Sequence, residues 1–413
     1  MIRQMHLLAG LLLAGLLPVG TPLMAEPGLP PEASVEQALE EHPEVNAARA
    51  RLEAAQARAK GLARGPYEFT VQGTYQRRNV RSGGEFDEYD AQLSRSFRLP
   101  GKARLDREIG RHGIEAAANM AEDARHEAAL ALAAYWFDWL SASALADVDR
   151  AAVANYEAAL AALERRRDLR DASRLEVDRA RAALAEARRI FEQSVGMADL
   201  ARSRLATRFP ALVLPTDAPG IPSPEMADAR LSQLGDLVVT NSHLIAAAEA
   251  ESERMAAMAD RAERDRVADP TIGLRAFSEF GGIERGAGLV LSIPLGGGYR
   301  SARANEAGAS ASAALSEARL ARVEVEETAT SDVLEARYRI ATWERARETV
   351  EAHIEALEKL RRGHELGEID LADLLLGERM VHTAFRIEAQ ARADTLRAIT
   401  KLRIDAHDLW LAD

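Results

Sequence analysis

The sequence predicts a mainly α-helical protein that contains two short β-hairpins and repeats one structural plan twice. Its 413 residues include 5% aromatics and no cysteine, and Ala, Glu, Arg and Leu dominate, which is typical of long packed helices. Two regions, from Arg104 to about Phe209 and from Arg300 to about Leu411, lack proline and repeat apolar residues at helical spacing. Each follows a pair of alternating segments, so helix, hairpin and long helix occur twice in the same order.

Residues 1–25 have the organisation of a secretory signal peptide. Arg3 lies in a short charged start, an apolar run extends from Leu7 to Leu17, and Leu23-Met24-Ala25 offers a cleavage site before Glu26. The run is short for a membrane-spanning helix, so an uncleaved anchor is the weaker alternative. Without cysteine the chain has neither disulfides nor a lipid-modified cysteine.

Charge and motif content exclude two classes of function. The 53 basic and 65 acidic residues are interleaved and give a net charge of −12, which offers no electrostatic support for nucleic-acid binding. The histidines are scattered from His42 to His407, and the sequence has neither an HExxH motif nor a Gly-rich phosphate loop. We therefore expect no enzymatic activity, no cofactor and no bound metal.

The first repeat, residues 26–209, begins with a helix that must end at Pro66. A β-hairpin follows at about 67–99. Its first strand has the period-two alternation of a strand with one apolar face, and its second resumes that alternation after Ser82-Gly83-Gly84. The apolar row of the first strand contains Tyr67, Phe69, Val71 and Tyr75.

A linker with five prolines, residues 210–225, separates this repeat from the second, residues 226–413. The second repeat again has a helix that ends at a proline, Pro270, and a hairpin at about 271–295 around Gly281-Gly282. Its apolar rows are Ile272, Leu274, Ala276, Ser278 and Phe280, and then Ala287, Leu289, Leu291 and Ile293.

Both hairpins end in residues that allow a sharp change of direction into the following helix. The predicted swivels are Pro100 and Gly101 in the first repeat and Gly296, Gly297 and Gly298 in the second.

Each long helical region is interrupted once, at about 166–173 and at about 363–370. Ser173 with Glu176, and Asp370 with Asp373, have the spacing of a capping box, so a new helix starts after each interruption. Both interruptions are therefore predicted to be turns of helical hairpins.

One chain thus supplies four strands of about ten residues, a length that spans a bilayer when the strand is tilted. Four strands cannot close a barrel, and open sheet edges are not viable in lipid. Either several chains share one membrane barrel, or the sheet is soluble and packs against the helices.

The order of these parts resembles the TolC-like outer-membrane efflux proteins over essentially the whole mature chain. SIPLGGGYRSARANEA is similar to the family's strand end, glycine-rich swivel and helix start, and LGEIDLADLLLGER to its helical tip and returning helix. The resemblance implies a homotrimer with a twelve-stranded β-barrel that is continued by a periplasmic α-helical barrel. It also implies that the row from Tyr67 to Tyr75 faces outer-membrane lipid.

By this resemblance the two turns are periplasmic tips that dock an adaptor protein, which joins the duct to an inner-membrane pump, expected to be of the resistance-nodulation-division type. The tip residues are Leu169, Arg170 and Ser173 in the first turn and Leu366, Gly367 and Asp370 in the second. Because Arg170 replaces the glycine of the second tip, the tips are expected to dock differently. The alternative is that these residues only form the turns.

Asp373 aligns with the position where this family places an acidic ring at the closed end of the tunnel. Three copies of one carboxylate near an axis would repel each other and attract cations. Leu376 stands where some relatives have a second Asp, which allows a partly hydrophobic gate. The alternative is that Asp373 only caps its helix.

FRLPGKARLDREIG is similar to the exit segment of heavy-metal efflux ducts, the CzcC/CusC-like subgroup, which makes metal cations the preferred cargo. Ducts for multidrug efflux or type I protein secretion, and a secreted coiled-coil scaffold, are the alternatives. Near the first hairpin loop, Arg77, Arg78 and Arg81 either contact lipopolysaccharide phosphates or belong to a solvated loop.

Overall fold

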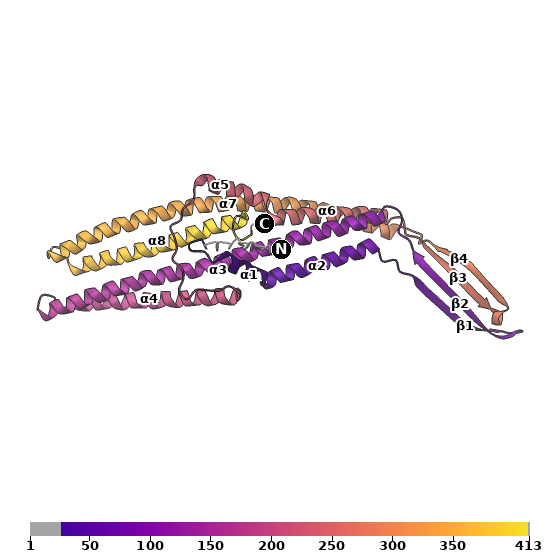
Figure 1. Ribbon diagram of the computed structural model, residues 1–413, viewed down its shortest axis with the longest axis horizontal. Helices are drawn as coiled ribbons and strands as arrows, with labels where there is room; N and C mark the ends of the chain where they lie inside the picture. The colour runs from indigo at the N-terminus through magenta and orange to yellow at the C-terminus, as the bar shows by residue number, and fades with distance from the viewer. Residues whose placement is uncertain (1–25, 412–413) are drawn as a thin grey trace, which may run out of the picture.

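The computed structural model describes residues 26–411, so the predicted signal sequence lies outside the described residues. The described chain is elongated, with long helices along most of its length and a four-stranded sheet that projects from one end (Figure 1). Its elements are α1 Glu32–Glu40, α2 Pro43–Arg64, β1 Thr70–Val80, β2 Gly84–Ser96, α3 Lys102–Asp168, α4 Arg174–Arg208, α5 Asp228–Thr240, α6 His243–Arg264, β3 Thr271–Glu279, the 3₁₀ turn η1 Phe280–Gly282, β4 Glu284–Ser292, α7 Gly298–Glu365 and α8 Leu371–Asp405.

Two halves have the same order of elements, since α1–α2–β1–β2–α3–α4 is followed by α5–α6–β3–β4–α7–α8. The expectation of a mainly α-helical chain with a small antiparallel sheet is confirmed. With 67 and 68 residues, α3 and α7 are each about 100 Å long at 1.5 Å per residue.

The helices lie four abreast on both sides of the middle of the molecule. Toward the sheet the neighbouring pairs are α2 with α3, α3 with α6, and α6 with α7, which is the order in which these helices join the four strands. Toward the other end α4 and α8 replace α2 and α6, and the neighbouring pairs are α4 with α3, α3 with α8, and α8 with α7 (Figure 1).

Two apolar cores form near the middle, where α1 and α5 pack on the long helices. The first contains Trp136 and Phe137 of α3 together with Phe209 beyond the end of α4. The second joins Leu234 of α5 to Leu402 of α8. By length and composition α3 contains a stretch apolar enough to cross a membrane, but half of that stretch is buried inside the protein. We therefore interpret α3 as a core helix.

The sheet is antiparallel throughout, in the order β1-β2-β3-β4, and the pairing of β2 with β3 joins the two halves of the chain. Two sequence assignments at its ends are corrected. Tyr67 and Phe69 precede β1, which begins at Thr70, and Phe280 leaves the row of Ile272 because β3 ends at Glu279 and the chain turns there.

Candidate functional site

The four strands align so that one face of the sheet is apolar across its whole width. Directly paired residues of antiparallel strands point to the same face. One such row is formed by Val71, Leu93, Leu274 and Leu289, and the next by Gly73, Ala91, Ala276 and Ala287. Val71, Leu274 and Leu289 are 78%, 60% and 82% exposed. The apolar rows of both hairpins therefore merge into one uncovered surface.

The opposite face is mostly polar. Its rows contain Gln72, Gln92 and Arg275, then Thr74, Asp90 and Phe277, and then Gln76, Glu88, Glu279 and Glu284. The strands have 9 to 13 residues, which suits a bilayer-spanning length.

Within residues 26–411, no α-helix covers either face of the sheet, and both edge strands have a free side. Among the described residues no α-helix packs against the strands, and Figure 1 shows the sheet extending beyond the helix ends. β1 and β4 each have a strand on one side only. The sheet is therefore not packed on the helices, as a soluble sheet would require, and an exposed apolar face with free edges needs further partners.

A buried ionic network joins the sheet to the helices. Lys102, 1% exposed, donates from Nζ to Asp269 over 2.8 Å and forms an ion pair with Asp265 at 2.8 Å. The backbone N–H of Leu99 also donates to Asp269, over 3.0 Å. Burial raises the pKa of the Asp269 carboxyl, but hydrogen bonds from Lys102 and Tyr67 outweigh it and hold this pKa below its ordinary value.

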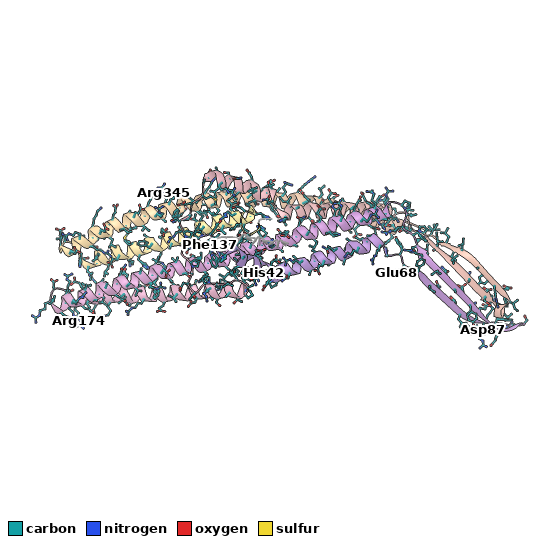
Figure 2. The ribbon with its side chains drawn as sticks, in the orientation of Figure 1. His42, Glu68, Asp87, Phe137, Arg174 and Arg345 are labelled. Atoms are coloured by element: carbon teal, nitrogen blue, oxygen red, sulfur yellow. The ribbon has the colours of Figure 1, made fainter. Side chains whose placement is uncertain are left out.

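Tyr67 belongs to this network, which corrects its assignment to the apolar strand row. Its hydroxyl donates to Asp269, and burial together with this bond raises the pKa of Tyr67 to about 12. Glu68, beside it, marks the junction in Figure 2. The polar hydroxyl has a buried acceptor here, whereas a lipid-facing position would offer none.

Two of the predicted swivel positions have a left-handed backbone conformation that only glycine adopts readily. Gly101 has φ 89° immediately before α3, and Gly296 has φ 89° two residues before α7. Gly297 and Gly298 have open space around their Cα atoms, and Pro100 lies in the turn before α3. The junction between β2 and α3 is held by the ionic network around Lys102. The junction between β4 and α7 is exposed over residues 293–298.

The first tip is a tight helical turn closed by a capping box. The Ser173 hydroxyl accepts from the backbone N–H of Glu176 over 3.2 Å, and the Glu176 carboxylate accepts from the backbone N–H of Ser173 over 2.6 Å. Leu169 directly follows α3 and is 80% exposed, and Arg170 comes next with φ 61°. Arg174 marks this end of the molecule in Figure 2.

The second tip has the same backbone geometry. Asp171 in the first turn and Glu368 in the second donate from their backbone N–H groups to carbonyls five residues earlier, over 2.8 and 2.9 Å. Arg170 and Gly367, with φ 61° and 76°, are the corresponding left-handed residues. The arginine therefore changes the side chain at the tip but not the path of the chain.

Asp373 is exposed in the first turn of α8, but it does not cap that helix. The side chain of Asp370 caps α8, accepting from the Asp373 backbone N–H over 2.9 Å. Leu376 is 44% exposed one turn further along. Leu366, which directly follows α7, is also exposed. The carboxylate of Asp373 and the side chain of Leu376 are thus available to other groups.

The arginines near the first hairpin loop have acidic neighbours. Arg77 lies 3.2 Å from Glu85, and Arg78 lies 3.1 Å from Glu88. Arg81 is exposed. Two of the three cations are thus paired within the protein, which leaves Arg81 as the better candidate for an external phosphate.

A buried polar cluster, which residue spacing does not indicate, connects the two helical hairpins. Asp149 of α3, whose side chain is fully buried, accepts from His382 of α8 over 2.7 Å and also binds Arg386 of α8 and Ser194 of α4. Burial raises the pKa of the Asp149 carboxyl, but these hydrogen bonds, of which the one from Arg386 has the largest effect, lower the pKa below its ordinary value. Their 233-residue separation explains why spacing could not reveal the contact between Asp149 and His382.

Histidines that are distant in sequence meet near the middle. The ring of His407 lies 5.5 Å from that of His126 and 5.0 Å from that of His243, and Asp405 accepts from His126 over 2.8 Å. Within residues 26–411, no group of three or more His, Asp or Glu side chains has an arrangement that could hold a metal ion.

No protein-family model matches the sequence, and no curated protein matches it either. Solved structures do match. The outer membrane protein VceC from Vibrio cholerae is 17% identical with a TM-score of 0.75, covering 91% of this chain and 95% of VceC. The open state of the Neisseria gonorrhoeae MtrE outer membrane channel is 17% identical with a TM-score of 0.72, covering 92% and 89%. The chain shares their fold.

CusC, described for its transmembrane channel formation, is 14% identical with a TM-score of 0.68 and covers 91% of both chains. It matches no more closely than VceC or MtrE, so the fold does not single out a subgroup. At these identities the comparisons establish the fold alone.

Proposed function

We propose that the protein is the outer-membrane channel of a tripartite efflux system and passively conducts its cargo across the periplasm and the outer membrane. The observation that supports this most directly is the segregation of residues on the sheet: an uncovered apolar face for lipid and a polar face for water. In lipid every backbone polar group must be paired, so the free edges of β1 and β4 require other strands.

Three copies of the chain satisfy this requirement in our proposal. They supply a twelve-stranded barrel, an even number as in bacterial outer-membrane barrels. The four helices abreast at each level of one chain continue the barrel as a twelve-helix tunnel into the periplasm. The glycines at 101 and 296–298 let the chain change direction from strand to helix at the membrane surface.

Labelling in intact outer membranes tests the two faces. Val71 and Gln72 are adjacent on β1 and point to opposite faces. We expect a lipid-phase thiol probe to label Val71→Cys and a water-soluble probe to label Gln72→Cys. The reverse pattern would overturn the assignment of lumen and lipid, and extraction of the protein without detergent would support the secreted scaffold instead.

The tips are proposed to dock a periplasmic adaptor, which connects the channel to an inner-membrane pump of the resistance-nodulation-division type. Leu169 and Leu366 are exposed apolar residues at corresponding positions of the two turns, as a docking surface requires. Replacing both with Ser should abolish cross-linking to the adaptor while trimers persist in the membrane. Unchanged cross-linking would exclude the tips as the docking site.

Asp373 and Leu376 are proposed to form the periplasmic gate. Three Asp373 carboxylates near the axis would favour cations, and three exposed Leu376 side chains would resist wetting. The Asp373→Asn channel should then have lower cation selectivity in a planar bilayer, whereas Leu376→Ser should raise its open probability. An Asp373→Asn channel with wild-type selectivity would exclude the acidic ring.

Heavy-metal cations are the proposed cargo, supported by the similarity of the segment from Phe97 to Gly110 to the exit of metal-efflux ducts. Multidrug efflux and type I secretion use ducts of the same kind. A deletion strain should lose tolerance to metal salts. Loss of tolerance to dyes and antibiotics alone would replace the metal proposal with multidrug efflux.

A further inference from the structure

Besides Phe277, two aromatic residues lie on the polar face of the sheet at its free end, the end away from the helices. Phe86 pairs directly with Arg78, so it shares the face of Gln76 and Glu88 rather than that of Val71. The ring of Phe280 lies 5.4 Å from that of Phe86 at an interplanar angle of 70°, in an edge-to-face arrangement.

Phe280 reaches this position through a strained turn. Phe280, Gly281 and Gly282 all have left-handed backbone, with φ of 50°, 63° and 94°. A phenylalanine adopts this conformation only at a cost, so the surrounding contacts must hold it. The turn places Phe280 over the polar face, although alternation along β3 would have placed it on the other side.

Glu88 and Arg78 fix the turn against the sheet. Glu88 is 2% exposed; it accepts from the Gln76 amide over 2.5 Å and from the backbone N–H of Phe280 over 3.5 Å. Arg78 lies 3.1 Å from Glu88, and its guanidinium carbon is 5.0 Å from the centre of the Phe280 ring. The pair of rings is therefore held in place by a buried carboxylate and a cation.

We propose that Phe86 and Phe280, positioned by Arg78 and Glu88, form an aromatic constriction at the outer end of the channel. The inference depends on the proposed function, which makes the polar face the lining of the lumen. Three copies would place six phenylalanine rings at the external mouth. Apolar rings in a water-filled pore narrow it and resist hydration, so this site limits the passage of hydrated ions and large polar solutes.

Single-channel conductance in planar bilayers tests the constriction. The variant that replaces both Phe86 and Phe280 with Ala should conduct at least about 1.5-fold more than wild type, because six rings are removed from the external mouth. The sheet provides a matched control: Tyr75 and Tyr89 form a pair with the same 5.4 Å ring separation on the opposite face. Replacing both tyrosines with Ala should leave conductance unchanged.

A second variant covers the case in which the alanine variant fails to assemble. Phe280→Trp enlarges the ring at the same place and should lower conductance. If wild-type channels form and neither Phe variant changes conductance relative to the tyrosine control, the constriction is excluded while the channel function stands. If wild-type protein forms no channels at all, the proposed function itself fails.

Discussion

Leu274→Arg is the sharpest single perturbation of the proposed lipid face. Leu274 is the fourth of the nine residues of β3, close to the middle of the strand, and its direct partners are Leu93 and Leu289. It is 60% exposed in the single chain and no helix covers it. An arginine here would have to leave its charge in hydrocarbon or distort the barrel to reach water.

The size of the effect follows from its position. An arginine on the lipid face of a membrane barrel costs about 2–4 kcal/mol at the midplane and less toward the interfaces. Three symmetric copies multiply this to about 6–12 kcal/mol per trimer. We therefore expect Leu274→Arg to deplete the assembled trimer strongly, measured as the heat-modifiable band in purified outer membranes.

Gln72→Arg is the matched control, because Gln72 lies on the polar face of the sheet, on the edge strand β1, and pairs with Gln92. It should assemble at nearly the wild-type level. Normal assembly of Leu274→Arg together with loss of Gln72→Arg would reverse the two faces. Normal assembly of both would show that this sheet does not lie in lipid.

Three further predictions concern the helical part. Arg170→Gly should slow amide exchange at the first tip, and Gly367→Ala should speed it at the second, because a left-handed backbone conformation costs a non-glycine residue about 1 kcal/mol. Exchange rates equal to those of the wild type would show that the backbone at these positions is not strained. Asp149→Asn should loosen α8 and speed its amide exchange, since breaking a buried pair costs about 3–5 kcal/mol; Asp147→Asn, at an exposed site, is the control. Burial lowers the pKa of His42, whose ring nitrogens have no hydrogen-bond partner among residues 26–411, so the unfolded chain binds the proton first and stability falls as pH drops below about 6.5. His42→Leu should therefore raise the melting temperature more at pH 5.5 than at pH 8, and an equal gain at both pH values would exclude this titration.

Local patterns predicted the features that depend on neighbours in sequence. The capping box of Ser173 and Glu176 lies within four residues, and both of its hydrogen bonds are present. The period-two rows around Val71 and Leu274 fix which residues share a face, and pairing then merges them. Such features need only dihedral preferences and periodicity, which a sequence displays directly.

Contacts between distant segments could not be predicted in this way. Nothing in the spacing indicates that Asp149 will meet His382, or that Tyr67 will turn from its alternating row to bind Asp269. In both cases a buried carboxylate gathers donors from several elements, because an isolated buried charge is far less stable than a paired one.

Phe280 shows the same limit within one hairpin. Alternation counts residues along a strand and assumes that the backbone stays extended, so it places Phe280 beside Ile272 and Ala276. Three successive left-handed residues end the strand one position earlier and reverse the face on which the ring lies. A glycine pair permits such a turn but does not require it; the turn is selected by Glu88 and Arg78, which come from the other hairpin. Tyr67 and Phe280 thus depart from the alternating pattern because contacts across the two halves of the chain hold them.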